Sequence, residues 1–217
     1  MQTLAEKVLL LSPPGGLFDE TAVRNLLPDR SEAARKVLVH RAVSADEVIR
    51  LKPGLFLLAP ELRKTHPHPF VVAAMLHSPS HVSFESALSH HGLIPEAVYQ
   101  VGSVTSLRSR TFHTPIGVFS YIRVPADDSR AGVQALKVDG RSWVFVATPL
   151  RAIADLIYTR REVSWVKDGL AFLTESMRIE RDDLQEISFE SLDEICESLR
   201  SRRVTDYLRA LAKEIMT

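Results

Sequence analysis

Residues 31–58 constrain the fold of this chain more than any other stretch, because they join a short basic helix to a β-hairpin. At about 100° per residue, a helix over residues 31–42 has a small, apolar side and a cationic side. Ser31 can cap its start, since a serine hydroxyl accepts hydrogen bonds from first-turn amides. The inward side is predicted to hold Ala33, Ala34, Val37, Leu38 and Ala42, and the outward strip Glu32, Arg35, Lys36, Val39 and His40.

Two apolar runs follow this helix, at residues 47–51 and 55–58, and they are separated by Lys52-Pro53-Gly54. Proline and glycine between β-prone runs are typical of a tight turn, so the segment is predicted to form a hairpin. A helix followed by a basic hairpin is how a winged helix-turn-helix ends. In that module the helix enters the DNA major groove and the hairpin rests on the backbone. An amphipathic surface helix beside an ordinary hairpin is the alternative.

The residues before this stretch supply two further helices. A helix is expected over residues 4–11, and the Ser-Pro-Pro-Gly-Gly break at 12–16 ends it. Asp19 is expected to cap a second short helix, and the turn at 28–30 leads into the basic helix. The order helix, helix, helix, hairpin within 60 residues favours a three-helix winged arrangement.

Composition limits where a nucleic-acid site can lie. The 217 residues carry no net charge, so such a site must be a local patch. Residues 1–66 hold 10 Lys and Arg against 8 Asp and Glu, whereas residues 161–217 hold 9 against 13, so the front is mildly basic and the tail acidic.

The single cysteine, Cys196, excludes an intrachain disulfide and favours a reducing compartment. No apolar run approaches a membrane span, and the first residues lack a signal-peptide pattern, so we expect a cytoplasmic protein.

A Pro-rich segment at 64–69 is the expected boundary between a DNA-binding domain, residues 1–64, and a rear domain, residues 68–217. The predicted class is α+β: a winged helix-turn-helix, then a larger mixed α/β domain with antiparallel strands and a helical tail. Thr148 is expected to cap a helix with Pro149 at its first position. The other rear elements expected are helices at 70–77 and 83–91, strands at 98–104 and 118–124, a hairpin at 133–147, and four short helices over 163–216.

Three blocks of the sequence resemble a known family. They are VSFESALSHHGL at 82–93, RSRTFHTPIG at 108–117 and VATPLRAIADLIY at 146–158. Together with their surroundings, roughly residues 4–160, they are similar to the AbiEi antitoxins of type IV toxin–antitoxin loci, which serve in abortive infection, a phage defence. The resemblance implies that a front winged helix-turn-helix binds repeats in the locus's own promoter. It also implies that the rear domain antagonises a nucleotidyltransferase-like toxin, with or without direct contact.

The resemblance implies DNA contact by the 31–41 helix and the 50–54 hairpin, and a rear-domain role for the residues named last below. The chemistry and placement of the side chains then predict the individual DNA contacts. Lys36, Arg50 and Lys52 are expected to contact phosphates, which sets affinity without carrying sequence information. Arg35 and His40 are expected to reach base edges, with Val39 against a thymine methyl. The full DNA-binding set is Ser31, Arg35, Lys36, Val39, His40, Arg41, Arg50 and Lys52. The rear interaction surface is expected to comprise Ser83, Ser86, His91, Arg108, Arg110 and Thr114.

Two departures from the family pattern are present. The hairpin tip has Lys52-Pro53-Gly54 where the family more often has Arg-Gly followed by an aromatic residue. Leu150-Arg151 stands where the family usually has Glu-Lys.

Other functional classes have weaker support. Ser83, Ser86, His90, His91 and Asp155 are residue types of a hydrolase, but no nucleophile-elbow motif surrounds the serines. No phosphate-cradling glycine motif or metal-ligand spacing is present, so we expect no catalysis, metal or cofactor. Capping and packing also explain the serines and histidines of 82–93. A stand-alone regulator whose rear domain senses a small ligand is the remaining alternative.

Overall fold

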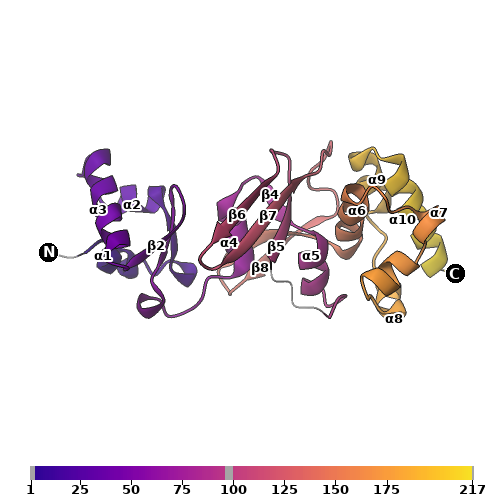
Figure 1. Cartoon of the computed structure of the whole chain (residues 1–217), viewed down its shortest axis with the longest axis horizontal. Helices are drawn as coiled ribbons and strands as arrows, with labels where there is room; N and C mark the ends of the chain where they lie inside the picture. The colour runs from indigo at the N-terminus through magenta and orange to yellow at the C-terminus, as the bar shows by residue number, and fades with distance from the viewer. Residues whose placement is uncertain (1–2, 96–99, 217) are drawn as a thin grey trace.

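The chain forms two β-sheets with helices packed against each, so the α+β class expected from the sequence is correct. The structure, a computed structural model, describes residues 3–95 and 100–216. Figure 1 shows an elongated molecule, with the first helices at one end, the larger sheet in the middle and the last helices at the other end.

The front unit is a bundle of three helices against a three-stranded sheet. All pairs in this sheet are antiparallel, and the strand order is β1-β3-β2. Local capping sets the helix starts, as expected: the Asp19 carboxylate accepts from Ala22 N at 2.8 Å and the Ser31 hydroxyl from Ala34 N at 3.3 Å. The elements are α1 (Leu4–Leu11), β1 (Leu17–Asp19), α2 (Glu20–Leu26), α3 (Glu32–Ser44), β2 (Val48–Lys52) and β3 (Leu55–Leu58), with 3-10 turns at Pro14–Gly16 and Pro60–Leu62.

Strand β3 separates two hydrophobic cores. Successive side chains of a strand point to opposite faces. Phe56 and Leu58 accordingly join the core formed with α1–α3, whereas Leu55 and Leu57 join the core that contains Val72 of the rear unit. Apolar packing therefore continues across the Pro-rich segment, and both faces of the front sheet are covered.

The rear unit is built on a six-stranded mixed sheet of order β6-β7-β5-β4-β9-β8. Strands β5 and β7 are parallel, as are β4 and β9, and the remaining neighbours are antiparallel. The strands are β4 (Ser80–Val82), β5 (Gln100–Thr105), β6 (Arg110–Thr114), β7 (Gly117–Arg123), β8 (Val133–Val138) and β9 (Ser142–Ala147). Strands β4 and β6 were not expected from the sequence, and residues 98–99 of the strand expected at 98–104 lie outside the described residues.

Helices cover both faces of this sheet (Figure 1). On one face lies α4 (Pro69–Leu76), to which Tyr121 of β7 donates a hydrogen bond of 2.6 Å at Ala73 O. The neighbouring Ser120 faces the other way, into a cavity bounded by α5 (Phe84–His90) and α6 (Pro149–Thr159). Thr148 caps α6 through Arg151 N, with Pro149 at the first position as expected.

The tail beyond α6 is helical, in five segments where the sequence predicted four. Arg203 fixes it to α6 and the turn that follows, because its Nη1 donates to Ile157 O at 2.6 Å and to Val163 O at 2.7 Å. Within the described part of the chain, no helix is both long and apolar enough to cross a membrane. The segments are α7 (Trp165–Asp168), a π-helical turn (Phe172–Ser176), α8 (Arg181–Gln185), α9 (Leu192–Leu199) and α10 (Arg202–Ile215).

Candidate nucleic-acid interface

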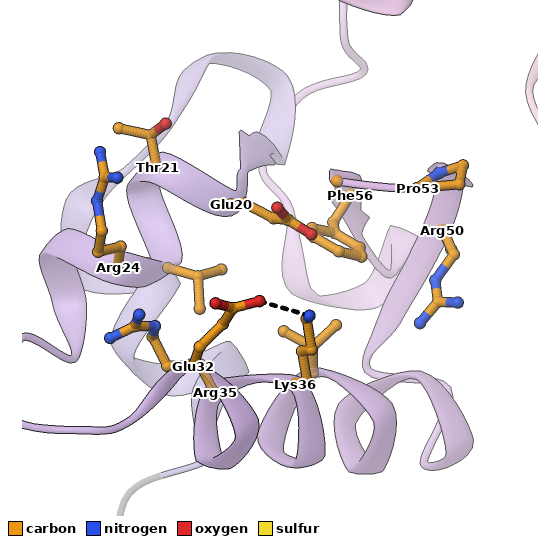
Figure 2. A pocket seen from close by; sticks show the side chains of 12 residues that line it. Glu20, Thr21, Arg24, Glu32, Arg35, Lys36, Arg50, Pro53 and Phe56 are labelled. Carbon is orange, nitrogen blue, oxygen red and sulfur yellow. Dashed lines mark hydrogen bonds and ion pairs between the residues drawn. The ribbon is translucent and has the colours of Figure 1, made fainter.

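A groove of about 590 Å³ lies between α2, α3 and the β2–β3 turn (Figure 2). Three apolar side chains, Val23, Val39 and Phe56, are buried beneath it. Six charged side chains surround them, four of them cationic. The charged set is Glu20, Arg24, Glu32, Arg35, Lys36 and Arg50.

Helix α3 is rotated relative to the sequence-based expectation. Val39 is only 6% exposed and Val37 is 48% exposed, the reverse of the predicted sides. The buried face runs through Val39 and Ala42, because these contact the front core. Val39 therefore belongs to the front core. The expectation that it lies on the outer strip, available to a thymine methyl, is wrong. The exposed face instead carries Lys36, Val37, His40 and Arg41.

Arg35 is half-buried and has a structural partner at each side of a turn. Its Nη1 donates to Arg30 O at 2.5 Å and to Leu27 O at 3.4 Å. These carbonyls lie in the segment between α2 and α3, so the guanidinium holds the two helices in register. The expectation that Arg35 is free to reach base edges is corrected accordingly.

Lys36 lies on the exposed face of α3 and forms an ion pair with Glu32 one turn earlier. Their Nζ and Oε1 atoms are 2.5 Å apart, and the side chains are 67% and 74% exposed. The hydrogen bond and charge of Lys36 lower the pKa of Glu32, and those of Glu32 raise the pKa of Lys36. A pair this exposed is screened by water, so Lys36 can exchange its partner for a phosphate at small cost.

The hairpin turn is fixed against α2. Gly54 has φ of +82°, which favours glycine, and its carbonyl accepts from Glu20 N at 3.1 Å. Arg50 is exposed beside this turn, with Cζ 5.9 Å from the centroid of the Phe56 ring. The groove therefore has a rigid edge with a cation on it.

Lys52 was expected to contact a DNA phosphate, but its side chain points toward the rear unit. Its Nζ donates to Leu76 O at the end of α4, at 2.8 Å, so it ties the front unit to the rear. Burial, and then the nearby charge of Arg110, lower the pKa of Lys52. The sequence offered no sign of this contact, since the two residues are 24 positions apart.

The groove is also lined by residues that the sequence did not predict. Arg24 and Glu20 reach the groove from α2, and Phe56 reaches it from β3. Only tertiary packing brings these elements together. The Glu32–Lys36 pair, by contrast, has the i, i+4 spacing that favours pairing on a helix.

Two residues expected on a rear contact surface are buried. Ser83 exposes no surface, and its hydroxyl donates to Asp155 Oδ2 at 2.7 Å. Ser86 is 5% exposed, donates to Gln100 O at 3.2 Å and accepts from Gly102 N at 2.9 Å. Both serines serve packing, and the contact role expected for them is corrected.

His91 and Thr114 are half-buried and also have internal partners. His91 Nε2 lies 2.9 Å from Ala147 O, and Thr114 donates to Gly117 O at 2.8 Å in the β6–β7 turn. These contacts position the ends of the strands and leave little of either side chain for a partner.

Arg108 and Arg110 are exposed, unlike the other rear candidates. Arg110 begins the edge strand β6 and places its Cζ 4.8 Å from the Phe112 ring centroid. The charge of Arg110 also lowers the pKa of Lys52, so this cationic edge lies near the junction with the front unit.

No group of three or more His, Cys, Asp or Glu side chains is arranged to hold a metal within residues 3–95 and 100–216. No protein-family model matches the chain, and no curated protein matches it significantly.

Proposed function

We propose that residues 1–64 form a winged helix-turn-helix that binds double-stranded DNA, and that the chain is a transcriptional regulator of its own operon. The element order α1-β1-α2-α3-β2-β3 with sheet order β1-β3-β2 supports the winged arrangement. The observation that carries the proposal is the groove that α3 and the β2–β3 turn share, with Lys36 and Arg50 beside it. Such a surface fits a helix in the major groove and a hairpin on the backbone.

The roles of individual residues follow from their exposure. Lys36, Arg50 and Arg24 of α2 are the phosphate contacts, because each is exposed at the groove. His40 and Arg41 are exposed on α3 and are the side chains proposed to read base edges. Arg35 and Lys52 contribute by holding the interface in shape.

A fluorescence-anisotropy titration with the chain's own upstream DNA tests this proposal. The double substitution Lys36→Ala/Arg50→Ala removes two phosphate contacts. It should therefore weaken binding and reduce the slope of log affinity against log salt concentration by about 2. The control Lys137→Ala/Arg141→Ala makes the same charge change on the exposed β8–β9 hairpin and should bind as the wild type does. An unchanged slope in the first variant rejects the interface.

We further propose that the rear domain, residues 68–217, antagonises a nucleotidyltransferase-like toxin. Support comes from the three sequence blocks similar to AbiEi antitoxins, and from the exposed cations Arg108 and Arg110 at the start of the edge strand β6.

Co-expression with a nucleotidyltransferase-like product of the neighbouring gene tests the antitoxin role. The wild-type chain should restore growth and Arg108→Ala/Arg110→Ala should not, while that variant still binds DNA. Lys137→Ala/Arg141→Ala again serves as control. Toxicity that the wild-type chain leaves unchanged rejects the antitoxin role.

A further inference from the structure

A second, smaller cavity of about 170 Å³ lies on the α6 face of the rear sheet. His81 of β4, Phe145 of β9 and Arg151 of α6 contribute to its wall. Arg151 is the notable member, because it has no exposed surface and yet its Nη2 has no hydrogen-bond partner among the described residues. A buried, unpartnered N–H group on a charged side chain is costly, so its presence beside a cavity points to a ligand.

Most polar atoms around Arg151 are already engaged, although His81 Nε2, from the same cavity wall, is also buried without a hydrogen-bond partner among the described residues. Its Nε donates to Asp155 Oδ1 at 3.0 Å, and its Nη1 donates to Ala131 O at 2.6 Å. Asp155 Oδ2 accepts from the Ser83 hydroxyl at 2.7 Å and lies 3.5 Å from His81 Nε2. The internal network thus uses both carboxylate oxygens and leaves Nη2 over.

Asp155 is held ionised despite its burial. Burial opposes ionisation, but Arg151, His81 and Ser83 together lower the pKa of its carboxyl group. The Asp155 charge therefore balances that of Arg151, and a further anion in the cavity needs a second cation. Arg130 supplies it, since this exposed residue also lines the cavity.

The chemistry of the wall selects an oxyanion. A guanidinium binds carboxylate or phosphate oxygens through charge-assisted hydrogen bonds. The hydroxyls of Ser106 and Ser129 line the same cavity and can donate to such oxygens. Drug-sized ligands occupy roughly 300–1,000 Å³, so a cavity of this size takes a small anion or the anionic end of a larger molecule.

We propose that this cavity is a binding site for a small oxyanion, a phosphate or a carboxylate. Arg151 Nη2 is the inner donor, and Arg130 is the cation at the mouth. The site depends on rear-unit geometry alone, so it holds whether or not the front unit binds DNA.

Isothermal titration of the full chain with inorganic phosphate, and separately with acetate, tests the proposal at constant ionic strength, with chloride as the reference anion. We expect saturable binding of at least one oxyanion. The anion that binds identifies whether the site takes phosphate or carboxylate. Chloride should give no saturable heat.

Substitutions at the cavity mouth avoid the buried network, whose loss risks unfolding. Arg130→Gln should weaken binding about tenfold, the loss of one charge-assisted hydrogen bond. Ser106→Phe, at an exposed lining position, should abolish binding by filling the mouth. Arg141→Gln, an equal charge change outside the cavity lining, should bind as the wild type does. The proposal is overturned if neither phosphate nor acetate binds saturably. It is also overturned if Arg130→Gln and Arg141→Gln weaken binding equally.

Discussion

Two ion pairs with the same helical spacing show how differently the two units use charge. Lys36–Glu32 on α3 and Arg151–Asp155 on α6 are both i, i+4 pairs. Both side chains of the first pair are about two-thirds or more exposed, whereas neither side chain of the second pair has any exposed surface. The exposed pair is screened by water and can be exchanged for a ligand. The buried pair is part of the fold, because either charge left alone would be desolvated without compensation.

Breaking the buried Arg151–Asp155 pair should destabilise the chain more than any other change considered below. Asp155→Ala leaves Arg151 buried without its counter-ion, so it should lower the free energy of unfolding by about 3–5 kcal/mol. Urea denaturation measures this. Glu32→Ala, the matched change in the exposed pair, should leave the unfolding midpoint within error. Equal effects of the two substitutions would contradict the comparison.

Removing both charges of the buried pair separates the cost of an unpaired charge from the cost of the lost contacts. Replacing both partners by Leu removes the charges together, so Arg151→Leu/Asp155→Leu should be less destabilised than Asp155→Ala alone. A double variant as unstable as the single one would show that the Ser83 and His81 contacts, and not the ion pair, set the cost.

A smaller effect is expected within α3 itself. Arg35→Ala removes hydrogen bonds to two carbonyls of the α2–α3 turn, so it should cost about 1–2 kcal/mol of unfolding free energy. Lys36→Ala, at the next position, should leave stability unchanged, because its partner is exposed. Thermal melting of the two variants measures the difference. A stable Arg35→Ala chain would mean that the guanidinium is free for a ligand after all.

Acidification provides the mildest perturbation. The folded-state pKa of Asp155 is lowered, so its contribution is present above the unfolded pKa of about 3.9 and is lost as pH falls toward the folded value. Stability of the wild type should therefore fall below about pH 4 by at most ~1.4 kcal/mol per pH unit from this group. Asp155→Asn should lack that component in urea melts at successive pH values. Parallel pH profiles for the two chains would exclude Asp155 as the source.

Local sequence signals were sufficient for much of the secondary structure. Asp19, Ser31 and Thr148 each cap the helix that the sequence predicted, because a side-chain oxygen and its first-turn amides are only two or three residues apart. The Lys52-Pro53-Gly54 turn is likewise a local property, since glycine at Gly54 permits the positive φ that the hairpin requires. The helical tail was also predicted, although not its division into five segments.

Contacts between distant residues were decided only by tertiary structure. Which face of α3 is buried depends on what packs against it, because its short alanine side chains allow more than one face to be buried. Val39 is therefore buried and Val37 exposed, the reverse of the prediction. The partners of Lys52 and Ser83 lie 24 and 72 positions away, beyond the range of any helical or strand period. The sequence alone thus determined the capped starts of α2, α3 and α6 and the position of the hairpin turn. Which polar side chains face water, and which are enclosed with a partner, depended on the packing of the two sheets and their helices.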